Sequence, residues 1–159
     1  MNFSPLIGFN MRSDGDRGSF LNLPTKNKQD HIIDNINYLS RDFSTIEMNG
    51  QEVYKFAIKE VPLMIDKLLK TTNYSPEKID WLLLHQANQR ILDSVGERLN
   101  VSNEKILSNL SDYGNTSAAT IPLMLDEAIR NKKIKQNDII ATSGFGAGLS
   151  WGAALIKWG

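Results

Sequence analysis

The chain contains no cysteine, which excludes disulfides, thiolate metal ligands and a cysteine nucleophile within its 159 residues. Its only histidines are His31 and His85, so a histidine-rich metal site is not expected. Lysine plus arginine equals aspartate plus glutamate at 18 each, so no net charge attracts nucleic acid or a membrane surface. No apolar run approaches the roughly 20 residues of a membrane span, and no signal peptide is recognisable. We therefore expect a cytoplasmic protein without metal or cofactor.

What is present is the composition of a globular domain. Hydrophobic residues make up 41% of the chain and charged residues 23%, which are ordinary values. A domain of this size buries roughly 68–70% of the surface of its unfolded chain. The length therefore fits one domain, or one lobe of a larger protein.

Apolar periodicity predicts an alternation of helices and strands from residue 49 onward. Apolar residues at 3–4 spacing predict helices, and short apolar runs between polar residues predict buried strands. The alternation favours an α/β fold. The expected elements are a helix from about 49 to 69, a strand at 79–84, a helix at 88–99, a weak strand at 106–110, a helix at 117–131, a strand at 138–143, a glycine loop at 144–148 and a strand at 149–158.

Residues 1–45 contain little regular periodicity. Residues 6–11 fit a strand, and the SDGDRG sequence at 13–18 has turn chemistry because Asp-Gly tolerates a positive φ. Residues 25–45 are polar and rich in asparagine, so we expect a surface loop there, with at most one short helix.

Three polar or glycine-rich breaks follow directly after apolar segments. They are His85, Asn115 and the GFGAG sequence at 144–148. In open α/β sheets the site lies beyond the carboxyl ends of the strands, so these breaks converge if their strands are parallel neighbours. Each also has a structural reading, as a core histidine, a loop or capping asparagine, and a tight glycine turn. The sequence pattern alone leaves both readings open.

Three motifs in order resemble one family. HQANQRI at 85–91, GNTSAATIPLMLDEA at 114–128 and SGFGAGLSWGAALI at 143–156 look like the C-terminal half of β-ketoacyl-acyl-carrier-protein synthase III. This family of the thiolase superfamily contains the condensing enzymes that start type II fatty acid synthesis. The resemblance implies an α/β fold with a mixed sheet and helices, the C-terminal half of a thiolase-like αβαβα sandwich. It also implies that residues 1–45 are the tail of the N-terminal half with a connecting loop, and that 46–159 are the C-terminal catalytic domain.

The resemblance implies an acyltransferase that performs a decarboxylative Claisen condensation. An acyl starter from acyl-CoA is joined to malonyl-acyl-carrier protein, and the enolate formed by decarboxylation attacks the acyl group. His85 and Asn115 match the family's decarboxylation pair, Phe145 matches the wall beside the malonyl carboxylate, and the backbone N–H of Ala147 matches an oxyanion-hole donor. The family's nucleophilic cysteine belongs to its N-terminal half, so we expect this chain to be an incomplete fragment.

Further positions match the family's binding surfaces. Gly50 and Asn88 match residues that line the pantetheine tunnel, while Lys55, Arg90 and Arg98 match a basic surface that receives the acidic carrier protein. The expected partners are acyl-carrier protein, acyl-CoA and the missing N-terminal half or a dimer partner. Two alternatives stay open: a non-catalytic lobe that binds carrier protein or complements another chain, and a polyketide-type condensing enzyme. We also expect the isolated chain to be poorly soluble, because the helix at 117–131 is suited to a buried layer.

Overall fold

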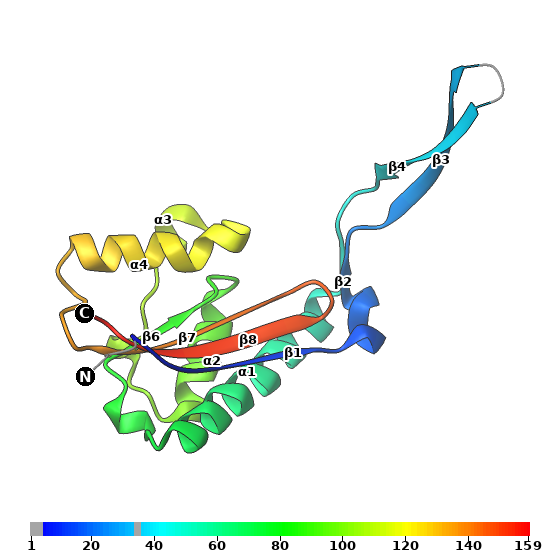
Figure 1. Ribbon diagram of the computed structural model, residues 1–159. Coiled ribbons are helices and arrows are strands. Elements are labelled where there is room, and N and C mark those ends of the chain that lie inside the picture. Colours follow the sequence, from blue (N-terminus) through cyan, green and yellow to red (C-terminus); the bar gives the residue numbers. More distant parts are fainter. Residues whose placement is uncertain (1–4, 34–35) are drawn as a thin grey trace.

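A four-stranded mixed sheet lies at the centre of the computed structural model, which describes residues 5–33 and 36–159 (Figure 1). β6 and β7 run parallel, whereas β8 is antiparallel to both β7 and β1, and the parallel pair brings its carboxyl ends to one edge. The strands predicted near 6–11, 79–84, 138–143 and 149–158 are confirmed. In spatial order the strands are β1 (Leu6–Ser13), β8 (Ser150–Lys157), β7 (Ile139–Gly146) and β6 (Trp81–Leu84).

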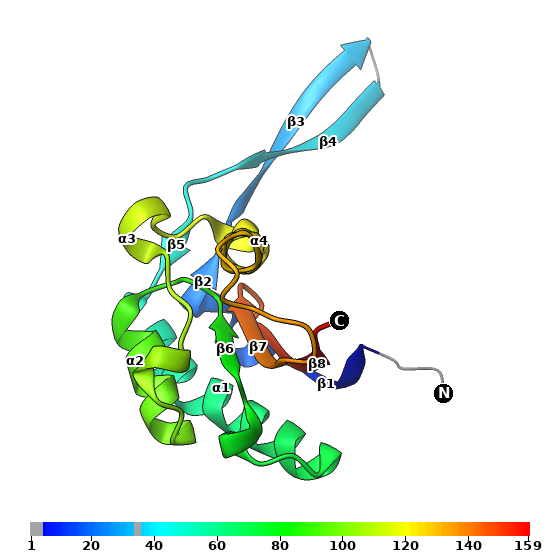
Figure 2. The ribbon, with the colours of Figure 1, turned by 90° about the vertical axis from the view of Figure 1, so that its left-hand side faces the viewer.

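Two helices, α1 (Gly50–Thr72) and α2 (Gln89–Leu99), cover one face of this sheet (Figure 2). α1 begins where the Asn49 side chain accepts the N–H of Glu52 at 3.2 Å, which satisfies one otherwise unpaired helix donor. The predicted 3–4 spacing is confirmed as a buried stripe that packs on the strands. Its members on α1 are Val53, Phe56, Ala57, Val61, Met64, Ile65, Leu68 and Leu69.

A third helix, α4 (Thr120–Arg130), lies on the opposite face of the sheet (Figure 2). Thr120, Met124 and Ala128 recur every four residues and form its buried side. This side joins Leu83 and Ile140 in a second, smaller core. The helix is shorter than predicted, because residues 117–119 form the 3₁₀ turn η4 (Ser117–Ala119). The chain thus builds helix, sheet and helix layers.

The prediction of a surface loop at 25–45 is wrong. The structure has two strands there, β3 (Thr25–Ile33) and β4 (Ile36–Phe43), which pair with each other antiparallel and extend away from the body (Figure 1). The two strands of this ribbon satisfy each other's backbone hydrogen bonds without packing on the central sheet. Their sequence therefore needs no alternation of apolar and polar residues, which is the pattern that predicts a strand. At its base lie η1 (Gly15–Phe20), β2 (Leu21–Asn22) and β5 (Glu47–Met48), with β2 and β5 paired.

The weak strand predicted at 106–110 is also absent. Ile106 forms a single bridge to Leu82, and the chain then turns into the one-turn helix α3 (Leu110–Tyr113). The side chain of Gln86 bonds the carbonyl of Leu107 and the N–H of Asn109, so a side chain occupies the place of a strand partner. Short 3₁₀ turns complete the connections, η2 (Pro76–Lys78) and η3 (Asn103–Lys105).

The glycine loop predicted at 144–148 is shorter than expected. β7 continues through Gly144, Phe145 and Gly146, which pair with Gly152, Trp151 and Ser150 of β8, and the turn covers only residues 147–149. Glycines can keep the backbone hydrogen bonds of an antiparallel pair, so the glycine-rich composition did not show where β7 ends. In the part of the chain that the structure describes, no helix is long and apolar enough to cross a membrane.

Candidate active site

His85 lies directly after β6, at the edge where the parallel strands end. Its backbone N–H donates to the carbonyl of Ser143 on β7 at 2.9 Å, which extends the β6–β7 pairing by one residue. Its ring nitrogen Nδ1 lies 2.6 Å from the hydroxyl oxygen of Thr120, at the start of α4. The backbone of His85 is therefore held by β7, and its imidazole by the first residue of α4.

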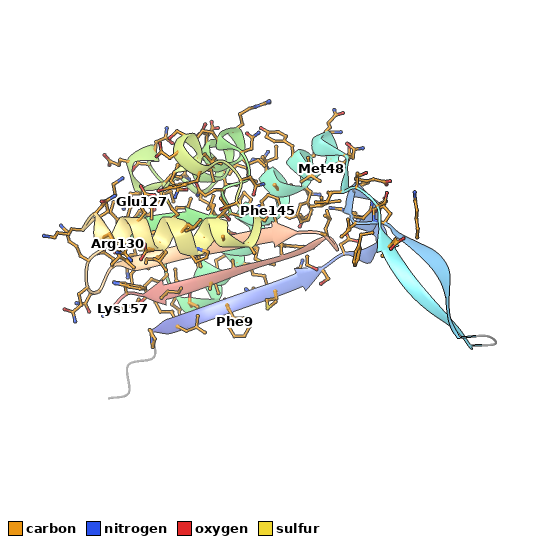
Figure 3. The ribbon with its side chains drawn as sticks, turned by 90° about the horizontal axis from the view of Figure 1, so that it is seen from above. Phe9, Met48, Glu127, Arg130, Phe145 and Lys157 are labelled. Carbon is orange, nitrogen blue, oxygen red and sulfur yellow. The ribbon has the colours of Figure 1, made fainter. Side chains whose placement is uncertain are left out.

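One aromatic ring contacts this imidazole on the side of β7, and it belongs to a cluster of three. The ring of Phe145 meets His85 edge-on at 5.2 Å between centroids, and Phe56 of α1 contacts Phe145 at 6.1 Å and Trp151 at 5.0 Å. Figure 3 shows Phe145 near the end of β7 beside the first turn of α4. Burial lowers the pKa of His85 below its usual value, because the charged form loses solvation there. The site thus favours neutral imidazole.

Asn115 lies in the connection between α3 and η4 and is exposed. Its side-chain carbonyl accepts the N–H of Ser117 at 2.9 Å, so the amide NH₂ is the end left to donate to another molecule. The carbonyl of Ser117 in turn accepts the backbone N–H of Thr120 and lies 3.0 Å from the hydroxyl oxygen of Thr120, which contacts His85. A short hydrogen-bonded path therefore links the two residues of the predicted pair.

Ala147 begins the turn between β7 and β8 and is exposed. Gly148 follows with a φ of 138°, and a side chain there would meet the Ser150 side chain and backbone. A surface hollow opens beside this hairpin and reaches the site at Gly144 and Phe145. It is lined by Met11, Arg12, Ser13, Gly144, Phe145, Ser150 and Trp151.

The two residues expected in a substrate tunnel lie at the starts of helices. Gly50 is the first residue of α1 and is exposed, and a side chain there would meet only Met48, at 3.9 Å. Asn88 is the N-cap of α2, where its side chain accepts the N–H of Arg90 at 2.9 Å. Asn88 therefore caps the first turn of α2, a structural role that does not depend on a ligand.

The three cations expected at a carrier-protein surface project from the layer of α1 and α2. Arg90, on α2, lies over the ring of Tyr54 of α1 at 5.1 Å. Lys55 is paired with Glu52 at 2.7 Å. Arg98 is exposed eight residues beyond Arg90 on α2, about 12 Å along the helix axis. The described residues contain no group of three or more histidine and acidic side chains that could hold a metal ion.

Residues 69–158 match the family described as 3-oxoacyl-[acyl-carrier-protein (ACP)] synthase III C terminal, which is more than half of the chain. The chain belongs to this family. A curated relative, β-ketoacyl-[acyl-carrier-protein] synthase III of Prochlorococcus marinus, is 80% identical over 157 residues, which are 99% of this chain and 47% of that protein. The chain thus spans about half the length of the curated relatives it matches.

Solved structures agree with this membership of the synthase III family. The 3-oxoacyl-[acyl-carrier-protein] synthase III of Aquifex aeolicus is similar with a TM-score of 0.80 and 33% identity, over 96% of this chain and 44% of that one. The synthase III of Thermus thermophilus gives a TM-score of 0.81 and 33% identity, over 97% and 46%. The predicted class, an α/β fold of the thiolase-like type with a mixed sheet, is confirmed.

Two residues that contact or follow the site in this synthase III chain were not identified from the sequence. Thr120 is 2% exposed and contacts His85, and Gln86 is fully buried and bonded to three backbone groups. Thr120 is the polar member of the stripe with Met124 and Ala128, and a polar residue on a buried stripe is a recognisable exception. Gln86 gave no such pattern, because two of its three partners, Leu107 and Asn109, lie more than twenty residues further on.

Proposed function

We propose that this synthase III chain supplies the malonyl-decarboxylating half of a condensing enzyme of type II fatty acid synthesis, located in the cytoplasm. The complete enzyme joins an acyl group from acyl-CoA to malonyl-acyl-carrier protein. The observation that carries the proposal is a half-buried imidazole, His85, held at the end of β6 against Phe145, with its neutral form favoured. The chain has no cysteine, so the residue that carries the acyl group comes from outside these 159 residues.

The proposed chemistry needs donors that are already neutral. Cleavage of the malonyl carbon–carbon bond releases CO₂ and leaves its electron pair as an enolate on the thioester oxygen. An N–H of His85 and the amide NH₂ of Asn115 stabilise that oxygen. The enolate carbon then attacks the acyl thioester, the acyl carbon–sulfur bond breaks, and the cysteine leaves as a thiolate. The Phe145 ring offers the departing carboxylate no partner, which favours its loss as neutral CO₂. The N–H of Ala147 serves the oxyanion of the acyl group.

We assign binding of the carrier protein to the surface formed by α1 and α2. Lys55, Arg90 and Arg98 lie on the joint surface of α1 and α2, where cations attract an acidic carrier protein and orient it. Gly50 and Asn88, at the starts of the same two helices, line the path of the pantetheine arm of carrier protein or acyl-CoA. In this proposal residues 46–159 form the catalytic domain, and residues 1–45 lead in from the other half and lend β1 to the sheet.

A bare sheet face supports a second half or a dimer partner. Gly8 faces α1, where a side chain would meet Leu68 and Thr72, so its neighbours Phe9 and Met11 point to the other face by strand alternation. They are 62% and 79% exposed. Figure 3, seen from the α4 side, shows β1 and β8 with no helix over them. Small residues on β8 beside them, Gly152 and Ala154, allow close approach by a covering element.

The test is the release of CO₂ from malonyl-acyl-carrier protein by the protein that contains this chain. Each of His85→Ala and Asn115→Ala removes one donor and is expected to lower the rate about 10²- to 10³-fold. His31→Gln, at the chain's other histidine, is the control and should leave the rate within about twofold, as a substitution outside the site. Unchanged CO₂ release in His85→Ala would refute the proposal and favour a non-catalytic lobe that only binds carrier protein.

A further inference from the structure

The hydroxyl of Thr120 lies between two possible acceptors. Its oxygen is 2.6 Å from Nδ1 of His85 and 3.0 Å from the carbonyl oxygen of Ser117, and Thr120 itself is 2% exposed. A hydroxyl has one proton to donate. If the proton goes to Ser117, then Nδ1 must carry the imidazole proton and donate it to Thr120. If the proton goes to Nδ1, the imidazole proton sits on Nε2.

Two features of the contact favour donation to His85. The carbonyl of Ser117 already accepts the backbone N–H of Thr120, so it does not depend on the hydroxyl. The distance from the hydroxyl oxygen to Nδ1 of His85, 2.6 Å, is also shorter than the 3.0 Å from the same oxygen to the carbonyl of Ser117. Both features favour His85 as the acceptor of the hydroxyl proton.

We propose that Thr120 is a positioning residue that sets the tautomer of His85, with Nδ1 as acceptor and the proton on Nε2. This inference rests on the proposed function, because it makes His85 the N–H donor that an enolate oxygen requires. Within residues 5–33 and 36–159, Nε2 has no hydrogen-bond partner, so its proton is left for a bound molecule. With the opposite tautomer, Nε2 would present a lone pair to the enolate and repel it.

The direct test is ¹⁵N nuclear magnetic resonance of histidine-labelled protein, in the longest natural form of the chain. His85 is assigned as the signals lost in His85→Gln. At a pH where His85 is neutral, wild type should show an N–H nitrogen at Nε2 and a lone-pair nitrogen at Nδ1. A proton on Nδ1 in wild type would overturn the inference outright, with no variant needed.

Variants of Thr120 then test the cause. Thr120→Val keeps the shape and removes the donor, so the ¹⁵N signals should shift toward a mixture of tautomers. Thr120→Ser should restore the wild-type pattern. Thr71→Val makes the same chemical change on α1, where the hydroxyl bonds only Leu68, and should leave the His85 signals in place. Wild-type signals in Thr120→Val would also overturn the inference.

Activity separates this inference from the function on which it rests. Thr120→Val should lower the rate of CO₂ release about 2- to 10-fold, the range of one net hydrogen bond, with KM unchanged and the rate largely recovered in Thr120→Ser. If the tautomer shifts in Thr120→Val but the rate does not fall, the tautomer has no catalytic role and the inference fails. If His85→Ala retains full activity, the proposed function fails, whatever the tautomer.

Discussion

At the residue scale, the character of His85 comes from its neighbours. The ring lies against Phe145, close to the cluster with Phe56 and Trp151, and its one hydrogen-bonded nitrogen faces a neutral hydroxyl. None of these groups is a carboxylate that would stabilise the imidazolium. Burial therefore lowers the pKa of His85 without an opposing charge, and the neutral ring persists at lower pH than in a free histidine.

This lowered pKa predicts a pH dependence of stability. Below the ordinary histidine pKa of about 6.5, the unfolded chain binds a proton at His85 before the native chain does. The free energy of unfolding should therefore decrease as the pH falls below that value, until the native imidazole is protonated as well. Denaturant unfolding of the complete protein that contains this chain, as wild type and as His85→Gln between about pH 8 and pH 5, measures this, and the difference isolates His85. A wild type that gains stability relative to His85→Gln on acidification would contradict the shift.

At the element scale, Gln86 joins the end of β6 to the segment that leads to Asn115. Its NH₂ donates to the carbonyls of Leu84 at 2.8 Å and Leu107 at 3.2 Å, and its carbonyl accepts the N–H of Asn109 at 3.3 Å. Both halves of the amide are used, and the side chain is fully buried. One side chain thus satisfies backbone groups that would otherwise need a strand partner.

We expect Gln86→Met to lower the free energy of unfolding by about 2–4 kcal/mol, because it leaves buried backbone groups without partners. The loop that bears Asn115 should loosen as well, since Asn109 loses its bond to Gln86. Gln51→Met, at an exposed position on α1, is the matched control and should change stability by less than about 0.5 kcal/mol. Denaturant unfolding of the complete protein that contains this chain measures both free energies, and equal effects of the two variants would contradict a special role for Gln86.

The sequence predicts best those elements that pack on the central sheet. α1, α2 and the buried strands are readable because one face or both faces must be apolar. The ribbon of β3 and β4 is not readable, because it pairs with itself away from the core. The segment at 106–110 is misread because a side chain from residue 86 replaces a strand ladder, and such a long-range bond leaves no local pattern.

The candidate site follows the same division. His85 and Phe145 were predicted to converge as breaks after neighbouring parallel strands, and their rings are in contact. Asn115 was placed after a strand that does not exist, and it joins the site through Ser117 and Thr120 instead. Thr120 was missed although a polar residue on the buried stripe of α4 is a recognisable exception, because the sequence does not show that its partner is His85. The catalytic roles of these residues stay predictions.

At the scale of the whole molecule, helices cover the two faces of the central sheet unequally. α1 and α2 pack on one face, while α4 covers β6 and β7 on the other and leaves β1 and β8 bare (Figures 2 and 3). On α4, the helix on the same face of the sheet, Leu123 is also 43% exposed. A large exposed apolar patch usually marks an interface and promotes association when it is left open.

The isolated chain is therefore expected to self-associate and to unfold without a sharp cooperative transition. Replacing Phe9 and Met11 together by threonine should shift the molecular mass in solution toward the monomer, because threonine suits a strand and removes the apolar strip. Leu63→Thr, an exposed leucine on α1 that is 55% exposed, is the control and should not. Light scattering after size-exclusion chromatography measures the mass. A stable monomer with a sharp thermal transition in wild type would contradict this expectation.

The central claim is that decarboxylation belongs to residues of this chain, while acyl transfer needs a cysteine from outside it. The most direct measurement is the rate of CO₂ release from malonyl-acyl-carrier protein after the complete protein has been treated with a thiol-blocking reagent. We predict that condensation stops, because the acyl-carrying cysteine is blocked, while CO₂ release continues and depends on His85 and Asn115. CO₂ release that ends together with condensation, or that persists unchanged in His85→Ala, would contradict the claim.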